Sequence, residues 1–212
     1  MPAPAGFAPT KIVGIGLNYL AHAREMQKPL PEEPLLFLKP PSALIGDGEP
    51  IVLPRGYARV DYEGEVAVVM ARQARRVAPE RALDFIAGVT CLCDVTVRDL
   101  QRKDVQYTRA KGFDTFCPIG PRIAALGGAL DPRALHITTR LNGELRQDST
   151  TTDLIFDIPR LVAFVSGVMT LEPGDVITTG TPPGVGALRA GDVVEIAIDG
   201  VGVLRNPVVD AA

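Results

Sequence analysis

The residues best placed to do chemistry are two glutamates at the start of an apolar run. Glu63 and Glu65 flank Gly64, and the β-branched residues that follow predict a buried strand over 66–70. Because side chains alternate along a strand, both carboxylates point to one side, with Cα atoms roughly 6.5–7 Å apart. Such a pair is either solvated or shares a cation, and carboxylates suit hard ions such as Mg²⁺, Mn²⁺ or Ca²⁺. Taken alone, a solvated strand end is the simpler interpretation.

A third carboxylate follows the next apolar run of the chain. Asp94 comes directly after residues 89–93, which predict a second buried strand. It could complete a set of three oxygen ligands with the two glutamates. An acid that favours the start of a helical turn is an equally simple interpretation. Cys91 and Cys93 share the strand face opposite to Asp94, so we interpret both as core residues.

One histidine of the two has a carboxylate partner nearby in the sequence. His22 and Glu25 are three residues apart on a predicted helix over 19–26, so they share a face. A carboxylate beside an imidazole sets the tautomer and basicity that proton transfer requires. A surface ion pair is the alternative interpretation. His136 lies in an alternating strand pattern without a local partner, which favours an exposed strand residue.

Four further polar residues could contact a small anionic substrate. Lys111 precedes a Gly-Phe-Asp-Thr segment and could hold a carboxylate, or it could be an exposed loop lysine. Arg98 and Gln101 share a face of the helical turn after Asp94. Thr181 lies in the glycine-rich loop 180–186, whose amides and hydroxyl could grip a carboxylate. The loop lacks the lysine of a phosphate-binding loop, so phosphoryl transfer is disfavoured.

The elements that must position these residues are mostly short strands. Asn18 is predicted to cap the first helix, and Pro79 to open a helix that runs to residue 86. Residues 107–121 are interpreted as a loop. Asn142-Gly143 predicts a hairpin turn. The expected class is therefore mainly β with short helices (α+β), in one domain.

Composition narrows the classes of function and location. The chain has 212 residues, 46% hydrophobic and 22% charged, with a net charge of −3. This balance does not indicate the excess of basic residues that binding to nucleic acid or to an acidic membrane requires. No apolar run reaches the length of a membrane helix, and the first residues do not resemble a secretion signal. Three cysteines without framework spacing favour a reducing cytoplasm.

Several motifs, in this order, resemble the fumarylacetoacetate hydrolase family. The resemblance extends from about residue 11 to 208. It rests on Gly16-Leu17-Asn18-Tyr19 with His22 and Glu25, Leu36-Phe37-Leu38-Lys39-Pro40, Tyr62-Glu63-Gly64-Glu65, Asp94-Val95-Thr96 with Arg98-Asp99-Leu100-Gln101, Lys111-Gly112-Phe113-Asp114, Cys117-Pro118-Ile119-Gly120-Pro121, Asn142-Gly143-Glu144-Leu145-Arg146-Gln147 and Thr179-Gly180-Thr181-Pro182-Pro183-Gly184-Val185-Gly186.

This resemblance implies a mixed β-sandwich roll, a homodimer and a divalent ion, commonly Mg²⁺, with Mn²⁺ or Ca²⁺ as alternatives. It implies three sets of site residues: the metal ligands Glu63, Glu65 and Asp94; the proton-transfer pair His22 and Glu25 with the active-site lysine Lys111; and the substrate-binding residues Arg98, Gln101 and Thr181.

The resemblance also implies how the chain is divided. We expect a tail over residues 1–10 and one catalytic domain over 11–208, with a lid at about 19–34. The separate N-terminal domain of the founding hydrolase is not expected, so the chain is similar to the short form. Leu17 departs from the pattern, since many relatives carry a basic residue there.

The implied function is a Mg²⁺-dependent enzyme that acts on 2-oxo acids or their enols through a stabilised enolate. C–C bond cleavage is expected first, either acylpyruvate hydrolysis or oxaloacetate-type decarboxylation. An isomerase or decarboxylase of hydroxy-dienedioates in aromatic catabolism is the alternative. A non-catalytic β module that binds a small anion is the alternative from another class.

Overall fold

We describe residues 8–27, 29–128 and 130–212 in a computed structural model of the chain. Most of the expected N-terminal tail, residues 1–7, and Lys28 of the expected lid segment lie outside the described residues.

The largest sheet has seven strands in the order β2-β1-β12-β6-β7-β9-β3. It is mixed, since β1–β12 and β3–β9 are parallel and its other neighbours are antiparallel. Its strands are β1 (Ile12–Gly16), β2 (Leu35–Lys39), β3 (Leu44–Ile45), β6 (Gly64–Met70), β7 (Ile86–Cys93), β9 (Cys117–Ala124) and β12 (Val176–Thr178).

Two smaller sheets complete the β structure. The five-stranded sheet, in the order β11-β10-β14-β15-β4, consists of β4 (Ile51–Leu53), β10 (His136–Leu141), β11 (Glu144–Thr150), β14 (Val193–Ile198) and β15 (Gly202–Asp210). The three-stranded sheet consists of β5 (Val60–Tyr62), β8 (Thr96–Val97) and β13 (Gly186–Ala187).

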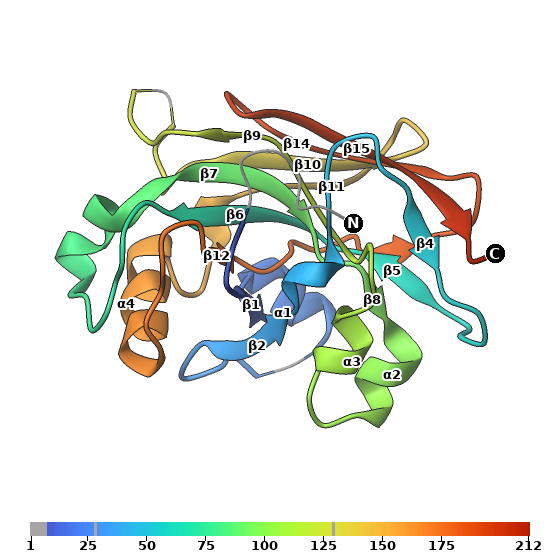
Figure 1. The fold of residues 1–212 in the computed structure, drawn as a ribbon, viewed down its shortest axis with the longest axis horizontal. Coiled ribbons are helices and arrows are strands. Elements are labelled where there is room, and N and C mark those ends of the chain that lie inside the picture. Colours follow the sequence, from blue (N-terminus) through green and yellow to red (C-terminus); the bar gives the residue numbers. More distant parts are fainter. Residues whose placement is uncertain (1–7, 28, 129) are drawn as a thin grey trace.

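The helices are short. The α-helices are α1 (Leu20–Glu25), α2 (Arg98–Lys103), α3 (Thr108–Lys111) and α4 (Ile158–Val168), and the 3₁₀ turns are η1 (Pro41–Ala43), η2 (Pro79–Phe85) and η3 (Thr151–Asp153). Figure 1 shows the α-helices on the side of the molecule away from β10, β14 and β15. The predicted mainly β fold with short helices is confirmed. None of the described helices has the length and apolar character needed to cross a bilayer.

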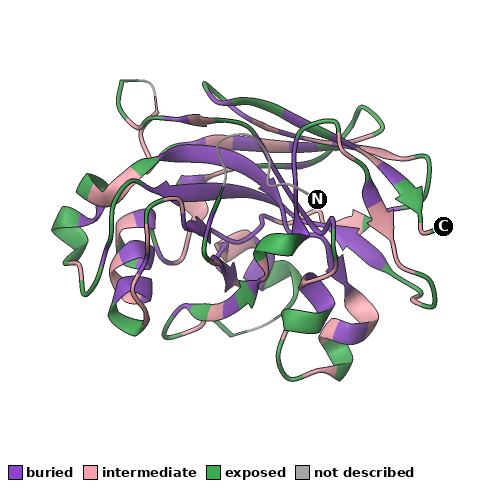
Figure 2. Cartoon of the chain, in the orientation of Figure 1, coloured by how far each residue is buried: buried purple, intermediate pink, exposed green. Residues whose placement is uncertain are grey.

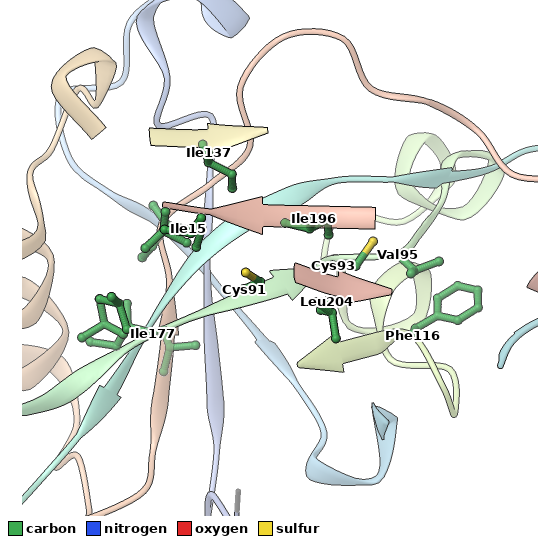
Figure 3. Close-up of a cluster of buried hydrophobic side chains, with 14 of the residues drawn as sticks. Ile15, Cys91, Cys93, Val95, Phe116, Ile137, Ile177, Ile196 and Leu204 are labelled. Carbon is green, nitrogen blue, oxygen red and sulfur yellow. The ribbon is translucent and has the colours of Figure 1, made fainter. Parts of the chain in front are cut away.

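The main core lies where the two larger sheets meet. Ile137 of β10, Ile196 of β14 and Leu204 of β15 pack with the side chains of Cys91 and Cys93 from β7 (Figure 3). Both cysteines are fully buried, as predicted for core residues. This packing fixes β7, and with it the end of the strand from which Asp94 follows.

Strand β6 is buried on both faces along its whole length (Figure 2). Val66 and Val68 face the main core, whereas Ala67 and Val69 face a smaller cluster on the other side of the sheet. Because side chains alternate, Glu65 belongs to the second face. A carboxyl group within a buried strand needs partners, which the site provides.

The prediction that Asn18 caps the first helix was wrong, because longer-range contacts decide where its side chain binds. Tyr19 rather than Asn18 precedes α1 as its N-cap. The amide of Asn18 instead donates to the carbonyls of Phe156 and Thr179, at 3.0 and 2.9 Å, and its oxygen accepts from Phe156. Asn18 therefore ties the end of β1 to two distant segments.

Two predicted segment types were also wrong. The expected helix from Pro79 is a 3₁₀ turn, and residue 86 already begins β7. The expected loop over 107–121 contains α3 and the start of β9. Pro118, Gly120 and Pro121 lie within β9, which pairs with both β7 and β3, whereas Gly112 follows the end of α3. Helix α4 begins at a side-chain cap, since the Asp157 side chain accepts from the Arg160 amide at 2.9 Å.

Candidate metal centre and active site

Pairing of β6 with β7 brings three carboxylates together. Gly64 lies opposite Cys93, so Glu63 lies opposite Asp94, and the Asp94 amide donates to the Glu63 carbonyl at 2.8 Å. The carboxylates of Glu63, Glu65 and Asp94 each offer an oxygen, and these oxygens lie within 4.8 Å of one another. The i, i+2 spacing and the strand register together account for the cluster.

The chemistry of this cluster suits a divalent cation. Glu63, Glu65 and Asp94 are only 6%, 1% and 0% exposed. Burial, together with the negative charges of Asp94 and Glu63, raises the pKa of Glu65 well above its usual value. Three converging oxygens from buried carboxylates match the ligands that Mg²⁺, Mn²⁺ and Ca²⁺ prefer. The residues therefore fit a metal ion, which would relieve the repulsion around Glu65.

Two buried lysines contact this carboxylate cluster, and both of them bind Asp94. Lys111 donates to Glu63 at 2.8 Å, to Asp94 at 2.5 Å and to the Thr96 hydroxyl at 2.8 Å. Burial lowers the pKa of Lys111, but Asp94 and Glu63 raise it by more. Lys39 donates to the other oxygen of Asp94 at 2.6 Å and to the Lys111 carbonyl at 2.5 Å. Both oxygens of Asp94 are thus held by ammonium groups.

Arg98 contributes a third cation and has three partners. Its guanidinium donates to Asp61 at 2.8 Å and to the side chain of Gln101 at 2.7 Å, and it pairs with Glu63 at 2.7 Å. Burial raises the pKa of Glu63, but Lys111 and Arg98 outweigh it and hold that pKa at about 2. Asp61 is fully buried and also pairs with Arg59 at 2.8 Å. The guanidinium of Arg98 is therefore held by two carboxylates, Asp61 and Glu63, and by the side chain of Gln101.

Sequence reasoning missed Lys39 and Asp61 as site residues. Asp61 continues the alternation of Glu63 and Glu65 backwards by two residues, and this spacing was the available signal. Lys39 ends an apolar strand, where a charged residue is unusual enough to suggest a buried partner. Its partner Asp94 is 55 residues away, and only the fold identifies it.

The loop around Thr181 closes one side of the site. Its hydroxyl donates to the Gly64 carbonyl at 2.9 Å and accepts from Gln147 at 2.8 Å. The Gly180 amide donates to Glu65 at 2.9 Å. The Thr181 hydroxyl would have to release Gly64 before it could donate to a substrate carboxylate, so its expected role stays a prediction.

A cavity of about 260 Å³ opens over these groups. Eight of the nine predicted site residues line this cavity: His22, Glu63, Glu65, Asp94, Arg98, Gln101, Lys111 and Thr181. Glu25, the ninth, is not among the lining residues, but its carboxylate lies 2.9 Å from Nδ1 of His22. This pairing leaves Nε2 as the ring nitrogen that Glu25 does not hold. Leu17 also lines the cavity, in the left-handed backbone region at φ 53°.

The second histidine lies outside this cavity. His136 is paired with two acids of the five-stranded sheet, Asp148 at 2.7 Å and Asp199 at 3.1 Å. Its side chain is 40% exposed, in line with the expected strand residue, but the two partners were not foreseen. They belong to β11 and to the turn after β14, so only strand pairing brings them close.

Comparison with known proteins identifies several relatives. A 5-carboxymethyl-2-hydroxymuconate delta-isomerase from Mycobacterium smegmatis has a structure similar to this chain, with a TM-score of 0.90 at 50% identity over 97% of this chain and 81% of that one. A maleylpyruvate hydrolase from a Sphingobium species, solved with manganese(II) and pyruvate, has a TM-score of 0.84 at 40% identity over 96% of this chain and 72% of that one. The mitochondrial oxaloacetate tautomerase fahd2 of Xenopus laevis is 42% identical over 95% of this chain and 66% of its own length.

The model of the fumarylacetoacetate hydrolase C-terminal domain matches residues 11–209. This match covers almost the whole chain and agrees with the relatives, which include an isomerase, a hydrolase and a tautomerase. The chain is an enzyme of the fumarylacetoacetate hydrolase family.

Proposed function

We propose that this enzyme acts on 2-oxo acids or their enols, with a divalent ion held by Glu63, Glu65 and Asp94. The observation that carries this proposal is the cluster of three buried carboxylates at a cavity that His22 also lines. A bound divalent ion supplies a Lewis acid for the 2-oxo group and for negative charge that develops on it. Mg²⁺ is the ion we expect, with Mn²⁺ or Ca²⁺ as alternatives.

The protein groups divide into those that bind the acid and those that move a proton. Lys111 and Arg98 bring positive charge to the cavity beside the carboxylate cluster, where an acidic head group would lie. His22 is 7% exposed, and Glu25 holds its Nδ1 atom, so Nε2 is the ring nitrogen that would accept and return a proton. His22 and Glu25 therefore serve as the base and its orienting carboxylate.

The proposed reaction is C–C bond cleavage. For an acylpyruvate, His22 accepts a proton from a water molecule that attacks the C4 carbonyl. The C3–C4 bond then breaks, its electron pair passes to the pyruvate enolate, and His22 returns the proton to C3. The products are pyruvate and the free acid, so atoms and charge balance. In an oxaloacetate-type decarboxylation, CO₂ leaves without an attacking water.

Isomerisation is the second candidate, and a specific similarity favours it. The Mycobacterium smegmatis relative at 50% identity is named as a delta-isomerase, and the Xenopus laevis relative as a tautomerase. In both reactions His22 would remove a proton from one carbon or oxygen and return it to another. The same groups serve all these reactions, so substrates and not site residues distinguish them.

A substrate panel tests the proposal. Acylpyruvates, oxaloacetate and hydroxy-dienedioates are each assayed with Mg²⁺ or Mn²⁺, for cleavage and for isomerisation. We expect turnover of at least one class, and His22→Gln should lower kcat by about 100-fold or more without changing Mn²⁺ affinity. His136→Gln, at the histidine outside the cavity, is the matched control and should retain activity. Full activity of His22→Gln would remove the proposed proton-transfer pair.

The organisation expected from the sequence is also part of the proposal. We propose that residues 11–208 act as one catalytic domain and that the segment 19–34 serves as a lid, because α1 carries His22 to the cavity. We further propose that the enzyme is a homodimer, which light scattering after gel filtration would test.

A further inference from the structure

Helix α2 carries polar side chains along the cavity from its buried part to its opening. Arg98, Gln101 and Arg102 all line the cavity. The side chain of Arg98 is 14% exposed, whereas that of Arg102 is 70% exposed. Because both line one cavity and differ so much in exposure, the two guanidinium groups mark two depths of that cavity.

The two arginines differ in how far the protein already uses their charge. Arg98 is engaged by Asp61, Glu63 and Gln101 at 2.7–2.8 Å. Arg102 lies 3.3 Å from a single acid, Asp99, which is a long and exposed ion pair.

Asp99 does not depend on this contact. It accepts the backbone amides of Ala58 and Arg59 at 2.8 and 3.1 Å. Its charge is therefore already solvated by hydrogen bonds from the backbone. Among the cations that line the cavity in the described part of the chain, Arg102 is thus the one most available to a ligand at the opening.

Apolar side chains also line this cavity. Phe37 and Tyr107 meet edge to face with ring centroids 5.8 Å apart, and Leu17 and Leu35 line the cavity as well. These groups offer no charge to a ligand, and they favour a carbon chain over a polar one. The cavity therefore combines a charged inner end, an apolar wall and a cation at its opening.

We infer that Arg102 determines specificity by binding a second carboxylate at the far end of the substrate. This inference rests on the proposed function and narrows it to 2-oxo acids whose carbon chain ends in another carboxylate. The head group lies by the carboxylate cluster, the chain lies against Phe37 and Tyr107, and the distal carboxylate pairs with Arg102.

Binding measurements with paired ligands test this inference. The ligands are succinylpyruvate, the same compound with its terminal carboxylate converted to a primary amide, and acetylpyruvate. Dissociation constants are measured by calorimetry with Mn²⁺ in a His22→Gln background, which suppresses turnover. Arg102→Met is compared with Lys103→Met, which removes the same charge from the adjacent position of α2, outside the cavity lining.

We expect Arg102→Met to weaken the binding of succinylpyruvate by about 10- to 100-fold, the contribution of a hydrogen bond to a charged group. The dissociation constants of the amide and of acetylpyruvate should change by less than about 3-fold. Lys103→Met should leave the dissociation constants of all three ligands unchanged. The role of Arg102 is overturned if Arg102→Met weakens the binding of all three ligands equally. It is also overturned if the affinity for succinylpyruvate does not fall. If none of the ligands binds with Arg102 intact, the proposed function itself is refuted, and this inference with it.

Discussion

Replacement of Lys39 by methionine should destabilise the protein far more than loss of an exposed ion pair. The side chains of Lys39 and Asp94 are both 0% exposed and lie 2.6 Å apart. Breaking a buried pair leaves the remaining charge without compensation, which costs about 3–5 kcal/mol. Asp94 retains Lys111 as a partner, so we expect a loss near the lower end, about 3 kcal/mol.

Urea unfolding at pH 7 in the presence of EDTA measures this loss. The control is Arg133→Gln, because Arg133 pairs with Asp131 while their side chains are 79% and 40% exposed. Because water and salt screen this exposed pair, its loss should leave the free energy of unfolding almost unchanged. A Lys39→Met variant within about 1 kcal/mol of the wild type would refute the reasoning, because the buried pair would then carry no more free energy than the exposed one.

A double-mutant cycle tests whether Asp94 is the side chain that Lys39 stabilises. Combining Lys39→Met with Asp94→Asn should cost less than the sum of the two single losses, since the second substitution removes the uncompensated carboxylate. We expect a coupling of about 1.5–3 kcal/mol, the range of hydrogen bonds to charged groups. Additive losses would show that the contact between these side chains does not stabilise the fold.

Three further outcomes follow from the structure. Gly64→Ala should lower the free energy of unfolding by about 1–3 kcal/mol in urea, because its Cβ would lie 2.0 Å from Thr139 Oγ1; unchanged stability would contradict this packing. Asp148 and Asp199 raise the pKa of His136 above 6.5. The free energy of unfolding of His136→Gln should therefore be lower than that of the wild type by a few tenths of a kcal/mol below pH 6.5. This difference should shrink as pH rises through the raised pKa, and a difference that grows with pH would contradict the ion pairing of His136. Burial raises the pKa of all three cysteine thiols, so a thiol reagent should label them only after denaturation, and rapid labelling of the native protein would refute this.

The sequence predicts the part of the site that depends on short spacing. The alternation from Glu63 to Glu65 places two carboxylates on one side of a strand, and the structure retains this geometry. It also predicts the contact of His22 with Glu25, because three residues of helix bring them within reach. Both are local consequences of helix or strand periodicity.

The remaining features depend on contacts between distant segments. Nothing near Asn18 in the sequence indicates that its side chain binds the backbone of Phe156 and Thr179. Nothing near Gly64 in the sequence indicates that Thr139 of the five-stranded sheet occupies the space beside it. The partners of Lys39 are likewise distant in the sequence, since Asp94 is 55 residues away and Lys111 is 72 residues away. Long-range pairing overrides local preference at each of these positions.

Calorimetric titration with Mn²⁺ tests the central claim most directly. The wild type should bind one ion per chain, and Glu63→Ala and Glu65→Gln should each weaken binding by at least about 100-fold, the upper end of the effect of losing an outer-sphere partner. Glu144→Gln, at an exposed acid, should bind as the wild type does. Unchanged affinity in both Glu63→Ala and Glu65→Gln would contradict the assignment of the buried carboxylates as the metal centre.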